Sequence, residues 1–108
     1  MSTSASGAEM GIDAGFAPDH HGAQWVYMGV LTFANAGPVL AATQAVALPT
    51  DGDIDLENLG AIDSSAVAVL VALKRRAEAE GKPLRFLHAP AALVALAEVY
   101  GVESLLGT

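Results

Sequence analysis

The sequence predicts a single α/β domain in which three to four helices pack on a mixed sheet of about four strands. Segments with strand and helix patterns follow one another in the order strand, strand, helix, strand, helix, strand, helix. Such alternation is typical of a sheet with parallel pairs joined by helical crossovers. The chain has 108 residues, 53% of them apolar, which is enough for one core but not for two. We therefore expect one domain over residues 11–108, preceded by a flexible tail of residues 1–10.

The first elements are the least defined by their pattern. "GIDAGFA", residues 11–17, allows a short edge strand, and whether residues 11–20 form one stays open. "PDHHGA" has the composition of a turn. "QWVYMGVL", residues 24–31, predicts the second strand of a hairpin, because tryptophan, valine and tyrosine favour strands, and Gly29 closes the run.

A helix is expected next, within "TFANAGPVLAATQAVALP". Thr32 or Asn35 can cap its start. Pro38 falls in or near its first turn, where a helix tolerates proline, and Pro49 stops it. Its apolar face is supplied by Val39, Leu40, Val46 and Leu48.

The second half of the chain alternates strand and helix more regularly. "DGDIDLENL" places apolar residues and acids in turn, which predicts a half-buried strand. A long helix is expected from Ser64 to about Glu80, ended by Gly81. "PLRFL" predicts another strand over Leu84–Leu87.

A final helix is predicted in "APAALVALAEVYG", and "VESLL" can add one more turn. Pro90 suits the first helical position and Gly101 suits the C-terminal cap. Its residues at helical spacing are Leu93, Leu96, Ala97 and Tyr100. Among Trp25, Tyr27 and Tyr100, we expect at least two to pack in the core.

Charge and composition argue against several classes of function. The formal net charge is −7, from 12 acids against 5 bases, which disfavours contact with nucleic-acid phosphate or an anionic lipid surface. Apolar stretches such as "AVAVLVAL" fall well short of the roughly 20 residues that span a bilayer, and no secretory signal pattern is visible at the start. We therefore expect a cytoplasmic protein that binds no nucleic acid and does not insert into a membrane.

The start of the long helix, Asp63-Ser64-Ser65, has two interpretations. An acid or hydroxyl at this place caps the free N–H groups of the first turn. A hydroxyl there also suits phosphorylation, because the same N–H groups and the helix dipole stabilise a phosphate. On the residues alone, capping is the more common role.

No metal site or cofactor is predicted. Asp51, Asp53 and Asp55 have the spacing of a calcium loop, but its sixth and twelfth positions hold Leu56 and Ile62 instead of glycine and glutamate. A strand with acids facing solvent explains this segment better.

The histidines and bases predict no site either. His20 and His21 lack a third ligand nearby, and His88 stands alone. The Lys-Arg-Arg run at 74–76 is interpreted as a solvated helix face. No base is patterned near Ser64, so we expect no enzyme.

A family resemblance rests on the segment "IDLENLGAIDSSAVAVLVALKRRAEAEGKPLRFLHAPAALVALAEVYGVESLL". Its strand, its Asp-Ser turn that opens a long helix, its next strand and its proline-started helix resemble a STAS domain, over roughly residues 25 to 106. With "GVLTFANAGPVL" and "LAEVYGVESLL", the chain is most similar to the small STAS subunits (MlaB-like) of Mla phospholipid transporters. It departs from the family at Ala66, where glycine is the most frequent residue.

The resemblance implies a STAS-like fold and a non-catalytic subunit that binds the cytosolic ATPase of a phospholipid-transport ABC complex at the inner membrane. The residues expected to contact this partner are Asp63, Ser64, Ser65, Ala66, Val67 and Arg75. The alternative that it implies is an anti-sigma factor antagonist, whose partner is an anti-sigma factor kinase. In that case Ser64, the hydroxyl directly after the acid, is the phosphoacceptor.

Overall fold

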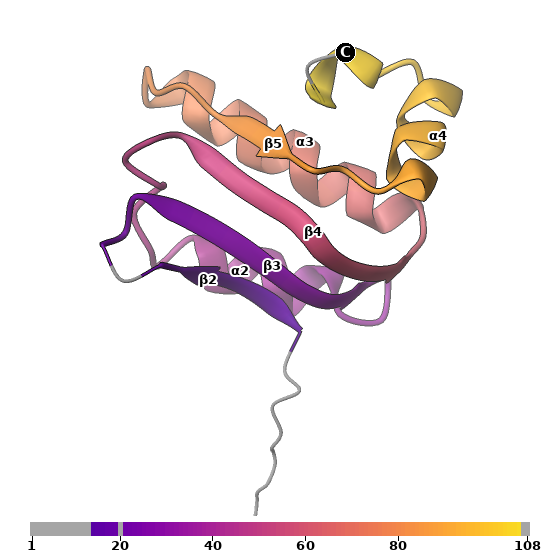
Figure 1. Cartoon of the computed structure of the whole chain (residues 1–108), viewed down its shortest axis with the longest axis horizontal. Helices are drawn as coiled ribbons and strands as arrows, with labels where there is room; N and C mark the ends of the chain where they lie inside the picture. Colours follow the sequence, from indigo (N-terminus) through magenta and orange to yellow (C-terminus); the bar gives the residue numbers. More distant parts are fainter. Residues whose placement is uncertain (1–13, 20, 107–108) are drawn as a thin grey trace, which may run out of the picture.

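The computed structural model describes residues 14–19 and 21–106 (Figure 1). The expected tail of residues 1–10 and the first part of "GIDAGFA" lie outside these residues. The strands are β2 (Gly15–Pro18), β3 (Gln24–Leu31), β4 (Asp53–Ile62) and β5 (Arg85–Leu87). The helices are α2 (Ala36–Thr43), α3 (Ser64–Ala79), α4 (Ala91–Val99) and the short 3-10 helix η1 (Glu103–Leu106). The predicted order of strands and helices is thus confirmed over the described residues.

The four strands form one mixed sheet in the order β2-β3-β4-β5. The edge strand β2 is antiparallel to β3, whereas β3, β4 and β5 are parallel to one another. Parallel neighbours need a crossover between them, and α2 and α3 supply the two crossovers. Figure 1 shows α2 and α3 behind the sheet, with α4 on the side where α3 begins, and η1 contacts α4 and β5. The sequence prediction of an α/β domain with a four-stranded mixed sheet is therefore correct.

The strand β3 does not end at Gly29, as the sequence suggested, but continues to Leu31. Gly29 has a φ of 95°, and the pairing register of β3 with β4 shifts on either side of it. A Cβ at this position would lie 2.8 Å from the Cβ of Ala14. The glycine therefore permits an irregularity inside the strand and a close approach of the chain before β2.

The helix α2 is shorter than predicted, because it ends at Thr43 and leaves Val46 and Leu48 outside it. The carbonyl oxygens of Thr43 and Val46 accept hydrogen bonds from the Arg76 guanidinium of α3, at 2.9 and 2.8 Å. These bonds satisfy the end of α2 without a further helical turn. The sequence predicted that this helix ends at Pro49, but it ends earlier, at Thr43.

The helices α3 and α4 lie close to their predicted ranges. Asp63 is the N-cap of α3, and Gly81, just beyond its C-terminal end, has a φ of 69°. Pro90 is the N-cap of α4 rather than its first residue, and Gly101 follows the helix at a φ of 71°. Tyr100 was expected on the apolar face of this helix, but it follows the last turn with its side chain exposed.

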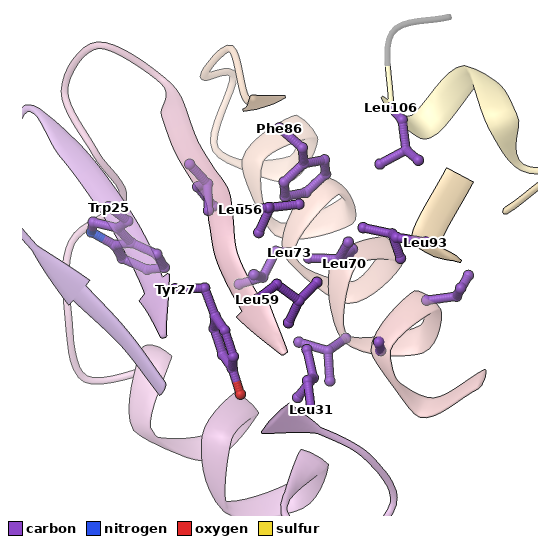
Figure 2. Close-up of a cluster of buried hydrophobic side chains, with 14 of the residues drawn as sticks. Trp25, Tyr27, Leu31, Leu56, Leu59, Leu70, Leu73, Phe86, Leu93 and Leu106 are labelled. Carbon is purple, nitrogen blue, oxygen red and sulfur yellow. The ribbon is translucent and has the colours of Figure 1, made fainter. Parts of the chain in front are cut away.

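The core lies between the sheet and the helices. Figure 2 shows Trp25 and Tyr27 on the β3 side and the leucines of β4 and α3 gathered opposite Phe86, Leu93 and Leu106. Trp25 and Tyr27 are both buried, as expected for at least two of the aromatic residues. The ring of Phe16 on β2 packs edge-on against Tyr27, with ring centres 4.6 Å apart. This contact fixes the edge strand against the core.

Candidate functional site

The start of α3 is fixed by the carboxylate of Asp63, which accepts two hydrogen bonds. Its Oδ1 accepts the backbone N–H of Ser65 at 2.8 Å, as a helix cap does. Its Oδ2 accepts the backbone N–H of Phe33 at 3.0 Å. One side chain thus caps a helix and joins it to the loop between β3 and α2.

These bonds stabilise the ionised form of the cap. The N–H of Phe33, and to a lesser degree that of Ser65, hold the pKa of the Asp63 carboxyl below its usual value, although partial burial opposes the change. Asp63 is therefore ionised at neutral pH. The predicted capping role of this acid is confirmed.

The residues predicted to contact a partner separate into two groups. Asp63, Ser64, Ser65 and Arg75 reach the surface, and the side chain of Ser64 is exposed. Ala66 and Val67 are only 0% and 6% exposed, and both belong to the hydrophobic core. The expectation that Ala66 and Val67 contact a partner is corrected accordingly, since they support the surface from beneath.

The outer side of α3 carries small residues beyond Ser64. Because 3.6 residues make one turn, Ser64, Ala68 and Arg75 lie near one line along the helix, and all three are exposed. No hydrogen bond or ion pair engages the Arg75 side chain within the described part of the chain. Between Ser64 and Arg75, this side of α3 therefore exposes small, uncharged side chains.

Phe33 is a candidate contact residue that the sequence reasoning missed. Its side chain is 83% exposed, the highest value among the large apolar side chains of the described residues. Its backbone N–H is hydrogen-bonded to Asp63, which places this residue beside the start of α3. The sequence offered little signal for it, because single exposed apolar side chains are common on protein surfaces.

The loop that carries Phe33 is rigidly bonded. The carbonyl oxygen of Val30 accepts the Tyr27 hydroxyl at 2.7 Å and the Asn35 amide at 3.0 Å. The Asn35 side-chain oxygen also accepts the N–H of Thr32 at 2.9 Å, so it does not cap α2 as predicted. This network restrains the backbone of the loop that carries Phe33, which lowers the backbone entropy lost when a partner binds. We call the exposed set Phe33, Asp63, Ser64, Ser65, Ala68 and Arg75 the α3 surface.

The other bases of α3 have structural roles. The ammonium of Lys74 donates to the carbonyl oxygen of Leu84, and Arg76 binds two carbonyl oxygens at the end of α2 and the carboxylate of Glu80. The solvated helix face predicted for residues 74–76 applies to Arg75 alone.

His88 does not stand alone, contrary to the sequence prediction. Its Nδ1 lies 3.0 Å from Oδ1 of Asp55, and Glu57 brings a third possible ligand atom within 4.8 Å of both. The hydrogen bond from the His88 imidazole to the Asp55 carboxylate is the main reason that the pKa of His88 is raised. His88 also adopts a φ of 58°, which turns its ring toward the strand.

Among the described residues, the other acids and histidines form no further cluster of possible metal ligands. Asp53 is paired with Arg85 at 2.8 Å across β4 and β5, and Asp51 lies in the preceding turn. This agrees with the strand that the sequence predicts in place of a calcium loop. His21 is exposed, and its backbone N–H donates to the carboxylate of Asp19. His20 lies outside the described residues.

Among the described residues, none of the helices combines the length and the apolar character needed to cross a membrane.

Fold and site together define a small α/β domain in which a capped helix start and an aromatic loop meet at the surface. A family model described as "Mlab, STAS domain" matches residues 27–107. The chain therefore belongs to the STAS domain family, and the resemblance drawn from its sequence is confirmed at this level. None of the curated proteins matches the chain.

The family includes both Mla subunits and anti-sigma factor antagonists, and its members are generally non-catalytic. The match begins inside β3, so β2 precedes the matched segment. The part that matches contains all residues of the α3 surface.

Proposed function

We propose that this chain is a non-catalytic interaction subunit that binds the cytosolic ATPase of a Mla-type phospholipid-transport ABC complex through the α3 surface. In this role it supports the assembly or activity of the complex at the inner membrane. The observation that carries the proposal is the exposed side chain of Phe33, whose backbone N–H is bonded to Asp63 at the capped start of α3.

The chemistry of the α3 surface suits a protein partner. Large aromatic residues dominate the binding energy of many interfaces, and they do so best when small neighbours let the partner close around them. Phe33 supplies the aromatic residue, while Ser64 and Ala68 supply the small neighbours. The single free charge, on Arg75, lies about three helical turns from Ser64 and can orient the partner.

A non-catalytic role also agrees with the surroundings of Ser64. Nucleophilic catalysis needs a base within hydrogen-bonding distance of the hydroxyl. Within the described residues no such bond engages the hydroxyl of Ser64, and the neighbouring carboxylate of Asp63 is occupied by two backbone N–H groups.

The proposal is tested by co-purification of tagged ATPase with variants of this chain. Ser64→Glu places a charge and a longer side chain on the surface, so we expect ATPase recovery to fall by about tenfold or more. Phe33→Ala should have a similar effect, because it removes the aromatic residue. Ser104→Glu adds the same charge at an exposed position of η1 and should bind normally.

Circular dichroism and the melting temperature of each variant establish that the domain is still folded. Undiminished recovery of the ATPase with folded Ser64→Glu and Phe33→Ala would remove the α3 surface from the interface. An equal loss of ATPase recovery with Ser104→Glu would indicate that the added net charge weakens binding wherever it is placed. This result would also contradict the proposal.

The second candidate is an anti-sigma factor antagonist that is phosphorylated on Ser64. It is favoured by the exposure of this hydroxyl at a helix start. Against it, Asp63 already accepts the N–H of Ser65, so a phosphate on Ser64 would add roughly −1.5 to −2 charges beside a carboxylate. Intact mass after incubation with an anti-sigma factor kinase and ATP separates the candidates: one added phosphate, absent from Ser64→Ala, favours this second function over the first.

A further inference from the structure

A cavity of about 600 Å³ lies between the edge strand β2 and the helix α2. Phe16 and Trp25 line it from the sheet, and Val39, Ala42 and Val46 line it from α2 and the segment that follows. It shares no residue with the α3 surface. Its volume falls in the range of about 300–1,000 Å³ that is typical of small-molecule sites.

The side chains that line the cavity offer almost no free polar group. No charged residue lines it, and its polar side chains are those of Asn35 and Thr43. Both amide atoms of Asn35 are bonded within its own loop, and the Thr43 hydroxyl donates to the carbonyl oxygen of Leu40. The nearby Arg76 directs its guanidinium to backbone carbonyl oxygens and to Glu80.

The segment of the chain that forms most of the cavity also contains no acidic residue, lysine or arginine. Between Asp19 and Asp51 there is no Asp, Glu, Lys or Arg, although the whole chain carries a net charge of −7. This stretch supplies β3, α2 and most of the residues that line the cavity. A charged ligand would lose part of its hydration here without gaining an ionic partner from any side chain of the lining, which is unfavourable.

We propose that the cavity between β2 and α2 is a binding site for a small, uncharged molecule that is rich in hydrocarbon, such as one with an alkyl chain and a neutral head group. The apolar walls supply the binding energy by removing hydrocarbon from water. The aromatic rings of Phe16 and Trp25, whose centres are 5.7 Å apart, form the wall on the sheet side. The site is independent of the proposed function, because no contact with the ATPase is required.

The proposal is tested with the full chain and a fluorescent probe, aminoanthracene, which is uncharged at neutral pH. Trp25 is the single tryptophan of the chain, so its emission reports directly on the wall of the cavity. We expect saturable binding of one probe molecule, with quenching of Trp25 emission and release of the probe by decanol. Decanoate has the same chain with a negative head group and should displace the probe about tenfold less effectively.

Two alanines of α2 form a matched pair of variants. Ala42 lines the cavity and Ala41 does not, although both are exposed. Ala42→Leu should weaken probe binding by about tenfold, because the longer side chain occupies part of the volume. Ala41→Leu, which is an equal substitution in the same helix, should leave it unchanged. Circular dichroism of both variants controls for folding.

Several results would overturn the proposal. The wild-type chain could fail to bind the probe saturably, or both leucine variants could weaken binding equally. Decanoate could compete as well as decanol, which would contradict the neutral class of ligand. Sedimentation could also give a dimer that only Ala42→Leu dissociates, in which case a second copy of the chain covers the cavity.

Discussion

Asp63 directly follows β4, and its carboxylate joins the start of α3 to the Phe33 loop. Sequence reasoning finds the bond to Ser65, because a cap and its N–H partner are two residues apart. It does not find the bond to Phe33, which is 30 residues away. The residue therefore does more for the arrangement of the surface than a helix cap alone would do.

Asp63→Ala is expected to lower the melting temperature by several degrees, since it leaves a helix cap and a loop N–H without an acceptor. Asp51→Asn, at an exposed acid of the turn before β4, is the control and should melt like the wild type. Because the pKa of Asp63 is lowered in the folded chain, its contribution is complete above an ordinary aspartate pKa of about 4. The difference between wild type and Asp63→Ala should therefore disappear as the pH falls through the lowered pKa, and a constant difference would contradict this assignment.

His88 gives a second prediction at the scale of single residues. Its pKa is raised, mainly by the hydrogen bond to Asp55. The pair therefore stabilises the folded chain fully at a pH below the ordinary histidine pKa of about 6.5, and less as the pH rises through the raised value. In an NMR titration of the imidazole, Asp55→Asn should lower the pKa of His88 toward its ordinary value. An unchanged pKa would mean that the two groups do not interact in solution.

Among the secondary-structure elements, the close approach of β4 to the segment before β5 depends on Gly52. This glycine has a φ of 76°, and a Cβ on it would lie 2.7 Å from the carbonyl oxygen of Pro83. The N–H of Arg85 donates to the Gly52 carbonyl oxygen at 2.6 Å, which begins the pairing of the two strands. A side chain at this position would separate them.

Gly52→Ala is expected to destabilise the chain by about 1–2 kcal/mol for the left-handed backbone and by about 1–3 kcal/mol more for the clash. Gly22→Ala isolates the first contribution, because Gly22 has a φ of 68° and open space around its Cβ position. Urea denaturation of the two variants measures the difference. Equal free energies of unfolding would show that the contact with Pro83 relaxes at no cost.

Local patterns predicted the elements well, and their errors have a common physical cause. The ranges of α3 and α4 follow from caps, glycines and apolar spacing, which are all local in the chain. The early end of α2 depends on Arg76, 33 residues from Thr43, and no local pattern contains this bond. The burial of Ala66 and Val67, in contrast, could have been predicted, because both share the apolar face of α3 with Leu70 and Leu73.

For the molecule as a whole, the net charge contrasts with the composition of the proposed contact surface. Apart from the capped Asp63, the α3 surface carries one charge, on Arg75, although the chain has a net charge of −7. Affinity for the ATPase should therefore depend weakly on salt, changing by about threefold or less between roughly 0.05 and 0.5 M. Fluorescence anisotropy of the labelled chain measures this. A steep decrease with salt would locate the interface at the acidic face of β4 instead.

The helix α2 is tied to α3 near both of its ends: Phe33 is bonded to Asp63 before its start, and Arg76 holds the carbonyl oxygens of Thr43 and Val46 after its last turn. Because bonds join the two helices at both places, the helices have little freedom to slide past each other. They therefore move together as one rigid layer on the sheet. A protein that grips the outer side of α3 consequently restrains the wall of the cavity as well. Hydrogen exchange in α2 should then become slower when only α3 is covered.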